Sequence, residues 1–499
     1  MNHVPLTWPD AAVLALLLAV MLALGYWKGG GQATTKDFFL ARRQIPWWAA
    51  CLSFVATEVS AVTLISVPAT AFMENWQYAQ FFIGSTAARF AIAYLFIPPF
   101  YHYNCTTIYE FLKHRFGAET QVTATIFFFI TRLLGSGVRF MVAALALSVL
   151  MGWPIIPAIL LFLGINVAYV MYGGMKSTVW TGTFQTSTYI VAGLATIGYI
   201  ACRLPGGWTQ LFHTASAAGK LRVWDWGPSW SDPAFVKNFF KDPNILWIAV
   251  ANGFFGSMAA FGTDQELMSR LLTVETRAKS QKAMVMTTIA SGVVLVIYLT
   301  VGASLYSFYA SNPGLPVPAK LDGIFPHFIG HSMPVLLRGF LLGMIALASM
   351  DTPLASLTSS FVTDIYRPVI HRDGTEEHYL RVSRVCVGVF AVLLALIAYG
   401  FSFYQKFLWL AFKIGGVTFG SLLGVFLLGF LTKRSSNRAN ILGMVLMAAV
   451  NAVLLILSEM GIVPLGWTWL LLIGTVGTFA VGYAFGPRMD QTLISQGLP

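Results

Sequence analysis

The chain has 499 residues, of which 57% are hydrophobic and only 10% charged, and its mean hydropathy is +0.71. A soluble domain carries about 25% charged residues, so this composition excludes an ordinary soluble protein. Apolar runs recur along the whole chain, each near the roughly 20 residues that a helix needs to cross a bilayer. The sequence therefore predicts an all-α polytopic membrane protein embedded in lipid.

The formal net charge of +11 has a simple explanation in a membrane protein, because basic residues gather in the loops on the cytoplasmic side. We therefore expect no nucleic-acid partner. The cysteines are scattered without a CxxC pair, which argues against a disulfide framework or a zinc site; they are Cys51, Cys105, Cys202 and Cys386.

Apolar runs bounded by polar residues, Gly or Pro predict about thirteen membrane-spanning helices. In chain order we expect them at 10–27, 46–73, 77–102, 121–151, 153–172, 177–201, 244–262, 283–306, 333–363, 385–402, 408–430, 440–459 and 466–486. The first run lacks the flanking features of a signal peptide, so we interpret it as a retained helix.

Lys and Arg concentrate in the short loops of one side, which the positive-inside rule makes cytoplasmic. The N-terminus is then expected outside and the C-terminus inside the plasma (inner) membrane, and we expect a monomer. The second to sixth helices before the long central loop and the seventh to eleventh helices after it match a five-plus-five inverted repeat. The predicted organisation is an extra helix and cytoplasmic linker (1–45), a first repeat (46–202), an extracellular or periplasmic loop (203–243), a second repeat (244–432) and two extra helices (433–499).

Two predicted helices contain features that interrupt a helix. The second has a centre rich in β-branched and hydroxyl residues, from Val55 to Thr63, followed by Pro68. The seventh reads NGFFGSMAAFG, in which Gly253, Gly256 and Gly262 loosen the helix. Interrupted helices line the central sites of transporters, whereas small residues also serve simple close packing in membranes.

Carboxylates fall within two of the predicted spans, where a charge is expensive and points to function. Glu58 lies in the middle of the second span, and Asp351 lies in the ninth among hydroxyl residues that include Ser349, Thr352 and Ser356. Such oxygen atoms suit a hard cation such as Na⁺. The hydroxyls can equally bond to their own helix or join neighbouring helices.

Basic residues also fall within the predicted spans, namely Arg89, Arg132, Arg139 and Lys413. We expect Arg132 and Arg139 to pair with Glu58 and Asp351, because unpaired charges are so unfavourable in hydrocarbon. Receiving an anionic substrate is the alternative role for these arginines.

Several stretches resemble the sodium:solute symporter family, in the right order over the whole core. They are DFFLARRQIPWWAACLSFVATEVSAVTLISVPA (37–69), TIYEFLKHRFG (107–117), TRLLGSGVRFMVAALALS (131–148), YGGMKSTVWTGTFQ (172–185), GTDQELMSR (262–270), ASMDTPLASLTSSFVTDIYR (348–367) and LLGVFLLGFLTKR (422–434). The resemblance implies a LeuT-like 5+5 inverted repeat core whose first and sixth helices are broken, here the second and seventh spans.

The resemblance also implies a sodium site. Its ligands would be the carbonyl groups of Ala56, Val59 and Ile345, position 348, and the hydroxyl of Ser349. Position 348 is often Ser in the family and is Ala here, so Ala348 removes one side-chain ligand. The family's W-T-D sequence is Trp180-Thr181-Gly182 here, so we expect one sodium ion per cycle, with Asp351 and Thr352 as candidates for a second cation or for charge compensation.

For the organic solute, the resemblance implies contacts from Glu58, Ser60 and Thr63, and from Phe82, Asn252 and Phe255 in the same cavity. Sialic acid carriers have Arg where this chain has Gly135, so that means of holding a carboxylate is absent. The predicted solute is of the sugar, sugar-acid or carboxylate type.

The function predicted from these residues is sodium-coupled symport by alternating access, with the sodium ion as cofactor. Proton coupling through Glu58 or Asp351 is one alternative. A solute sensor that has lost transport is another, and a channel is disfavoured by the interrupted helices. The chain has no HExxH, GxSxG or Walker A sequence, so we expect no enzyme activity.

Overall fold

The computed structural model describes residues 7–488 apart from 152, 230, 232–234, 236–238, 240–241, 243, 319–320, 349–352, 404–406 and 464. The α-helices over this part of the chain are α1 (Trp8–Lys28), α2 (Thr35–Leu40), α3 (Trp47–Glu58), α4 (Ala61–Met73), α5 (Ala79–Ala91), α6 (Ile97–His102), α7 (Tyr109–Arg115), α8 (Ala118–Met151), α9 (Ile155–Arg203), α10 (Gly207–Ala217), α12 (Leu246–Ser257), α13 (Gln265–Leu272), α14 (Arg277–Ser311), α15 (Ile324–Ser332), α16 (Val335–Ala348), α17 (Leu354–Ser360), α18 (Glu376–Ser402), α19 (Phe407–Leu431), α20 (Asn437–Glu459) and α21 (Thr468–Phe485). Short 3₁₀ or π segments join some of them: η1 (Ala41–Arg43), η2 (Ile92–Phe96), η3 (Met258–Gly262), η4 (Leu321–Gly323) and η5 (Phe361–Ile370).

Helices occupy all the predicted spans, but fewer than thirteen meet a strict length and hydropathy test. Among the described residues, 8 helices are long and apolar enough to cross a membrane, or up to 10 if each bent pair counts as one span. The number thirteen stays a prediction. The spans expected at 153–172 and 177–201 form one 49-residue helix, α9, which is broken at Gly174. Gly174 has φ 53° and ψ −140°, a conformation that favours glycine.

The first predicted interruption is confirmed, because α3 and α4 meet at an angle of 64°. Val59 and Ser60 between them have extended backbone conformations (φ −89°, ψ 98° and φ −89°, ψ 168°). The β-branched and hydroxyl residues of this stretch lower its helix propensity, which explains why the break falls here rather than at Pro68 inside α4.

The second predicted interruption is also confirmed. The segment from Leu246 to Gly262 meets α13 at 66°. The break follows Gly262, and the Asp264 side chain caps the new helix by accepting a hydrogen bond from the backbone N–H of Glu266 (2.9 Å). The two bends have similar angles, and one lies before the long central loop and the other after it.

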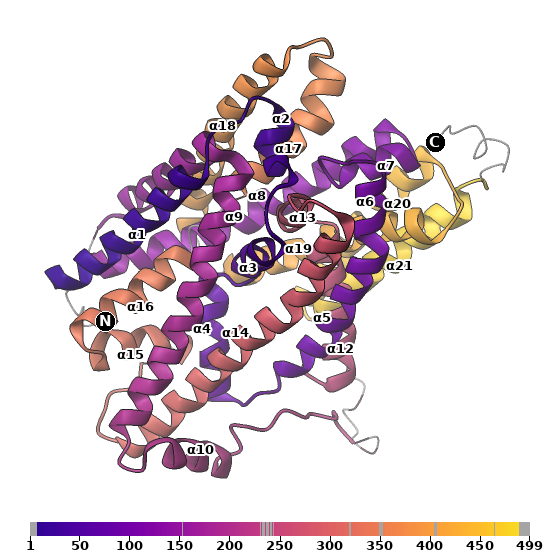
Figure 1. The fold of residues 1–499 in the computed structure, drawn as a ribbon. Helices are drawn as coiled ribbons and strands as arrows, with labels where there is room; N and C mark the ends of the chain where they lie inside the picture. The colour runs from indigo at the N-terminus through magenta and orange to yellow at the C-terminus, as the bar shows by residue number, and fades with distance from the viewer. Residues whose placement is uncertain are drawn as a thin grey trace.

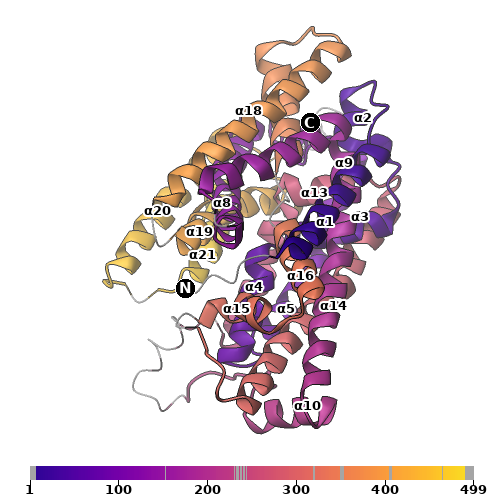
Figure 2. The same ribbon diagram turned by 90° about the vertical axis from the view of Figure 1, so that its left-hand side faces the viewer.

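The helices are arranged around these two bent spans (Figure 1). Helices α10 and α15 lie at one end of the molecule, whereas α2 and the start of α18 lie at the other, as the turned view also shows (Figure 2). The C-terminal helices α20 and α21 pack together with α19 at one side of the core.

Helices α5 and α12 approach backbone to backbone, which two glycines permit. A Cβ atom on Gly84 would lie 1.9 Å from the carbonyl oxygen of Val250, and one on Gly253 would lie 2.1 Å from that of Phe81. This crossing is too close for any larger residue, so the second bent span is held directly against α5.

Candidate functional site

The bend between α3 and α4 exposes backbone oxygen atoms at the end of α3. On either side of the bend, the amide of Val59 donates to Val55 (2.9 Å) and the amide of Leu64 donates to Ser60 (3.0 Å). Within the described part of the chain, no backbone amide donates to the carbonyl groups of Ala56 or Val59. A helix end leaves such carbonyl groups without partners, and carbonyl oxygens are ligands of hard cations.

The end of α16 lies in the same buried cluster as this bend. The cluster contains Ala56 and Val59 together with Ile345 and Ala348, so these members of the predicted sodium site belong to one continuous buried core. Ser349, Asp351 and Thr352 lie outside the described residues. The side-chain ligands of the site and the second-cation candidates therefore stay predictions.

Helix α9 forms hydrogen bonds to both α3 and α16. Thr183 and Thr186 donate to the carbonyl groups of Ala49 (3.2 Å) and Leu52 (2.7 Å) on α3. Gln185 donates to the carbonyl group of Leu347 on α16 (3.0 Å). Side chains of a single helix thus hold the relative position of α3 and α16.

Gly182, where the family has Asp, also belongs to this contact. A Cβ atom on Gly182 would lie 2.7 Å from the hydroxyl of Ser53 and 3.1 Å from its Cα atom. The missing side chain therefore lets α9 pack closely on α3, and a larger residue would displace one of the two helices.

Glu58, the last residue of α3, forms an ion pair with Arg89 of α5. Both guanidinium Nη atoms donate to its carboxylate, Nη2 to Oε1 and Nη1 to Oε2 (3.3 Å). The hydroxyl of Ser291 on α14 donates to Oε2 (2.6 Å). The predicted pairing of Glu58 with Arg132 or Arg139 is wrong, because α5 rather than α8 presents its arginine to the bend.

Arg132 instead pairs with two acids at the second bend. Its Nη2 lies 2.7 Å from Oδ1 of Asp264 and its Nη1 lies 2.8 Å from Oε2 of Glu266. These groups are almost fully buried, with side-chain exposures of 9%, 0% and 4% for Arg132, Asp264 and Glu266. Arg139 is half-buried on α8, and the side chain of Lys413 lies outside the described residues.

The second bend differs from the first in its backbone oxygens. The hydroxyl of Tyr109 donates to the carbonyl group of Thr263 in the break (3.0 Å). Gln265, at the start of α13, bonds to the N–H of Ile108 (2.9 Å) and to the carbonyl group of Thr106 (3.2 Å). Protein groups therefore already occupy this break.

A cavity of about 90 Å³ adjoins the first bend. It lies between α4, α5 and α14, and its lining residues include Glu58, Thr63, Tyr78, Phe82 and Ser291. Ser60 lies beside it, with its hydroxyl 3.4 Å from that of Thr63. Since one water molecule needs about 10–15 Å³, the cavity has room for a compact solute or several waters.

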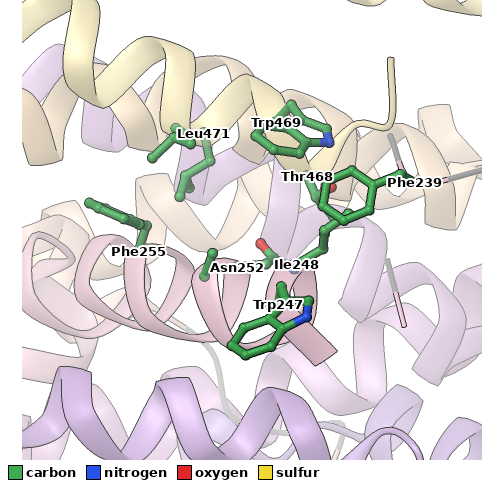
Figure 3. A pocket seen from close by; sticks show the side chains of 10 residues that line it. Phe239, Trp247, Ile248, Asn252, Phe255, Thr468, Trp469 and Leu471 are labelled. Atoms are coloured by element: carbon green, nitrogen blue, oxygen red, sulfur yellow. The ribbon is translucent and has the colours of Figure 1, made fainter. Parts of the chain in front are cut away.

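The structure places Asn252 and Phe255 in a different pocket from Glu58 and Phe82. This second pocket, of about 150 Å³, lies between α12 and α21. Figure 3 shows Asn252 and Phe255 on one wall and Thr468 and Trp469 on the other. The close crossing of α5 and α12 separates the two pockets, which the pattern of residues along the chain did not indicate.

Gly135, which replaces the arginine of sialic acid carriers, lies on α8 with open space around it. A Cβ atom there would meet nothing within 4 Å. The residues that sequence reasoning missed are Ser291 and Tyr78. A hydroxyl within a predicted apolar span was the signal for Ser291, and nothing in the local sequence distinguished Tyr78.

The model of the sodium:solute symporter family matches residues 38–446 of this chain. The chain belongs to the sodium:solute symporter family. It is 28% identical to the sodium/sialic acid symporter NanT of Aliivibrio fischeri, over 97% of this chain and 94% of that protein. It is 26% identical to the sodium/glucose cotransporter of Vibrio parahaemolyticus, over 88% of this chain and 84% of that protein.

A solved structure shares the fold of this symporter. It is a substrate-bound, outward-open Na⁺-coupled sialic acid symporter, with a TM-score of 0.84 and 22% sequence identity over 97% of this chain and 100% of that one. The predicted family, the LeuT-like fold and sodium as the coupling ion are confirmed. The symporter is an integral membrane transporter that moves an organic solute with sodium by alternating access, and it is not an enzyme.

Proposed function

We propose that this symporter binds one sodium ion and one small organic solute, of the sugar, sugar-acid or carboxylate type, at the bend between α3 and α4. The sodium ligands are the carbonyl groups of Ala56, Val59 and Ile345 and the hydroxyl of Ser349. Ala348 supplies no side-chain oxygen. The proposal is carried by one observation: the bend that leaves the carbonyl groups of Ala56 and Val59 without amide partners also places Glu58 in a cavity.

The solute in this proposal occupies the cavity lined by Glu58, Thr63 and Phe82, with Ser60 beside it. Asn252 and Phe255 line the other pocket, and Gly135 is not among the lining residues of this cavity, so their contact with the solute stays a prediction. Sodium stabilises the outward-open arrangement and so raises solute affinity, because a ligand shifts a conformational equilibrium only by its differential affinity.

The energy available is sufficient for strong accumulation. One Na⁺ moving down 100 mV supplies about 2.3 kcal/mol. A tenfold sodium gradient adds about 1.4 kcal/mol. Together these sustain a several-hundredfold gradient of a neutral solute.

The Glu58–Arg89 pair argues against proton coupling at the first bend. The Glu58 carboxylate accepts two hydrogen bonds from the Arg89 guanidinium and one from Ser291, so a proton relay through it would have to disrupt this ion pair. Asp351, the other acid of that alternative, lies outside the described residues.

We further propose that the symporter is a monomer in the plasma (inner) membrane with its N-terminus outside. The basic residues Lys36, Arg42 and Arg43 lie in and beside α2, and Arg372 and Arg381 flank the start of α18, at the same end of the molecule (Figure 2). The positive-inside rule makes this end cytoplasmic, which puts α10 and α15 outside.

Uptake into proteoliposomes tests the sodium site. We expect a sodium gradient, and not a proton gradient alone, to drive uptake of the solute found by screening for sodium-dependent thermal stabilisation. Ser349→Ala should raise the sodium concentration for half-maximal uptake at least tenfold. Ser383→Ala is the matched control, because the hydroxyl of Ser383 bonds within its own helix to Tyr379 (2.7 Å). Unchanged sodium affinity in Ser349→Ala would reject the proposed ligand set.

A further inference from the structure

The ion pair at the first bend presents only one of its two charges to the cavity. Arg89 has an exposed fraction of 0%, whereas the Glu58 side chain is 19% exposed and lines the cavity. The guanidinium lies under the rings of Phe82 and Phe261, at 5.4 and 4.8 Å from their centroids, and its Nη1 also donates to Thr287 (3.1 Å). A solute in the cavity therefore meets the carboxylate and not the guanidinium.

The Glu58 carboxylate has only one hydrogen-bond acceptor site left for a solute. A carboxylate has about four lone-pair sites. Three are used, one on Oε1 by Arg89 and two on Oε2 by Arg89 and Ser291. The site left over is an acceptor on Oε1, so it is satisfied by one hydroxyl or amide N–H of the solute.

The other described groups of the cavity do not provide a cation. Glu58 is the one charged residue among its described lining residues, and the polar remainder consists of the hydroxyls of Thr63, Tyr78, Ser291 and Tyr298. The Tyr298 hydroxyl already donates to the carbonyl group of Tyr189 (3.1 Å). Tyr78 and Phe82 supply aromatic surface on which an apolar face of a ring can pack. A carboxylate solute would place its charge beside that of Glu58 in a partly desolvated space, where repulsion between like charges is strong.

From this geometry we infer that the Glu58–Arg89 pair selects against carboxylate solutes and makes the symporter prefer a neutral, hydroxyl- or amide-bearing solute. The inference rests on the proposed function and narrows its solute class. It separates this chain from the sialic acid symporters that it resembles, although the fold is shared. Because the pair itself is neutral, binding a neutral solute leaves no uncompensated charge at the bend.

Matched pairs of probes test this selectivity on the purified full-length protein in NaCl. The pairs are galactose with galacturonate, glycerol with glycerate, and lactamide with lactate, and their dissociation constants are measured by competition and thermal stabilisation. We expect at least one neutral member to bind, and each bound pair to favour its neutral member by tenfold or more. Equal or tighter binding of the carboxylates, or no binding by any neutral member, would overturn the inference.

Two substitutions test whether Glu58 is the source of the preference for neutral solutes. Glu58→Gln leaves Arg89 without its carboxylate, so the preference for the neutral member should fall at least tenfold. Glu74→Gln, at the exposed end of α4 and outside the cavity, should keep the wild-type ratio. An unchanged ratio in Glu58→Gln counts against the inference. If that variant does not fold, the double variant Glu58→Gln/Arg89→Gln replaces it, and the wild-type ratios remain decisive.

The two proposals fail in different ways. If neutral solutes bind tenfold more tightly but equally well without sodium, the proposed sodium site is wrong and the selectivity stands. If a carboxylate solute binds more tightly and only with sodium, the selectivity is wrong and the sodium site stands.

Discussion

At the first bend, Glu58 ends α3 and pairs with Arg89 of a neighbouring helix. At the second, Asp264 caps the start of α13 and pairs with Arg132. Both interrupted helices thus place an acid at the break and balance it with an arginine from another span. The surroundings differ. Glu58 is 19% exposed towards a cavity, whereas Asp264 is fully buried.

The backbone carbonyl groups of the two bends also differ in their hydrogen bonding. The carbonyl groups of Ala56 and Val59 receive no hydrogen bond from a described backbone amide, whereas the carbonyl group of Thr263 accepts one from Tyr109. The comparison teaches that a broken helix is not by itself a binding site. What distinguishes the two breaks is whether the protein already satisfies the groups that the break releases.

The largest effect is expected from removing the arginine of the second bend. Arg132→Met leaves Asp264 and Glu266 buried without that cation, and breaking a buried pair in this way costs about 3–5 kcal/mol. We expect a large fall in the melting temperature of the purified protein, with partial recovery in the triple variant that adds Asp264→Asn and Glu266→Gln. Arg381→Gln, whose side chain is 76% exposed, is the control. If the Arg132→Met variant melted at the wild-type temperature, the structural role that we assign to this ion pair would be wrong.

A smaller loss of stability is expected at the first bend. In Arg89→Met the carboxylate of Glu58 keeps the bond from Ser291 and access to water, so the loss is about 2–3 kcal/mol. Solute binding, measured by sodium-dependent thermal stabilisation, should fall much more strongly than stability. If Arg89→Met were more destabilising than Arg132→Met, the assignment of a binding role to the first bend and a structural role to the second would be reversed.

The contact of α9 with α3 gives a test that affects the first bend alone. Gly182→Ala places a methyl group 2.7 Å from the hydroxyl of Ser53, and overpacking of this kind costs about 1–2 kcal/mol. Because α9 also holds α16, we expect weaker sodium binding as well as a lower melting temperature. Gly164→Ala on the same helix is the matched control, since its Cβ atom would meet nothing within 4 Å. Identical behaviour of the two variants would contradict this account.

The smallest effect is expected at the occupied carbonyl group of the second bend. Tyr109→Phe removes one hydrogen bond to Thr263, which contributes about 1 kcal/mol. We expect a slightly lower melting temperature and an unchanged sodium affinity, with Tyr26→Phe on α1 as the control. A changed sodium affinity would show that the second bend also takes part in ion binding.

Several features followed from the sequence alone. The helical spans were predictable because a bilayer requires every backbone group to be bonded within the chain, so apolar length identifies helices. Both interruptions were predictable from helix-breaking composition at 55–63 and at the glycines that end with Gly262. Glu58 was predictable as a special residue because a charge is costly within a span.

The tertiary structure alone decided which charges and which oxygens meet. Arg89 rather than Arg132 reaches Glu58, and Asn252 lies in a different pocket from Phe82. These contacts depend on the rotation of each helix about its axis and on the distance between helices, for example at the glycine crossing of α5 and α12. The order of residues along the chain fixes the spacing on one helix but not the face of another helix that it will meet.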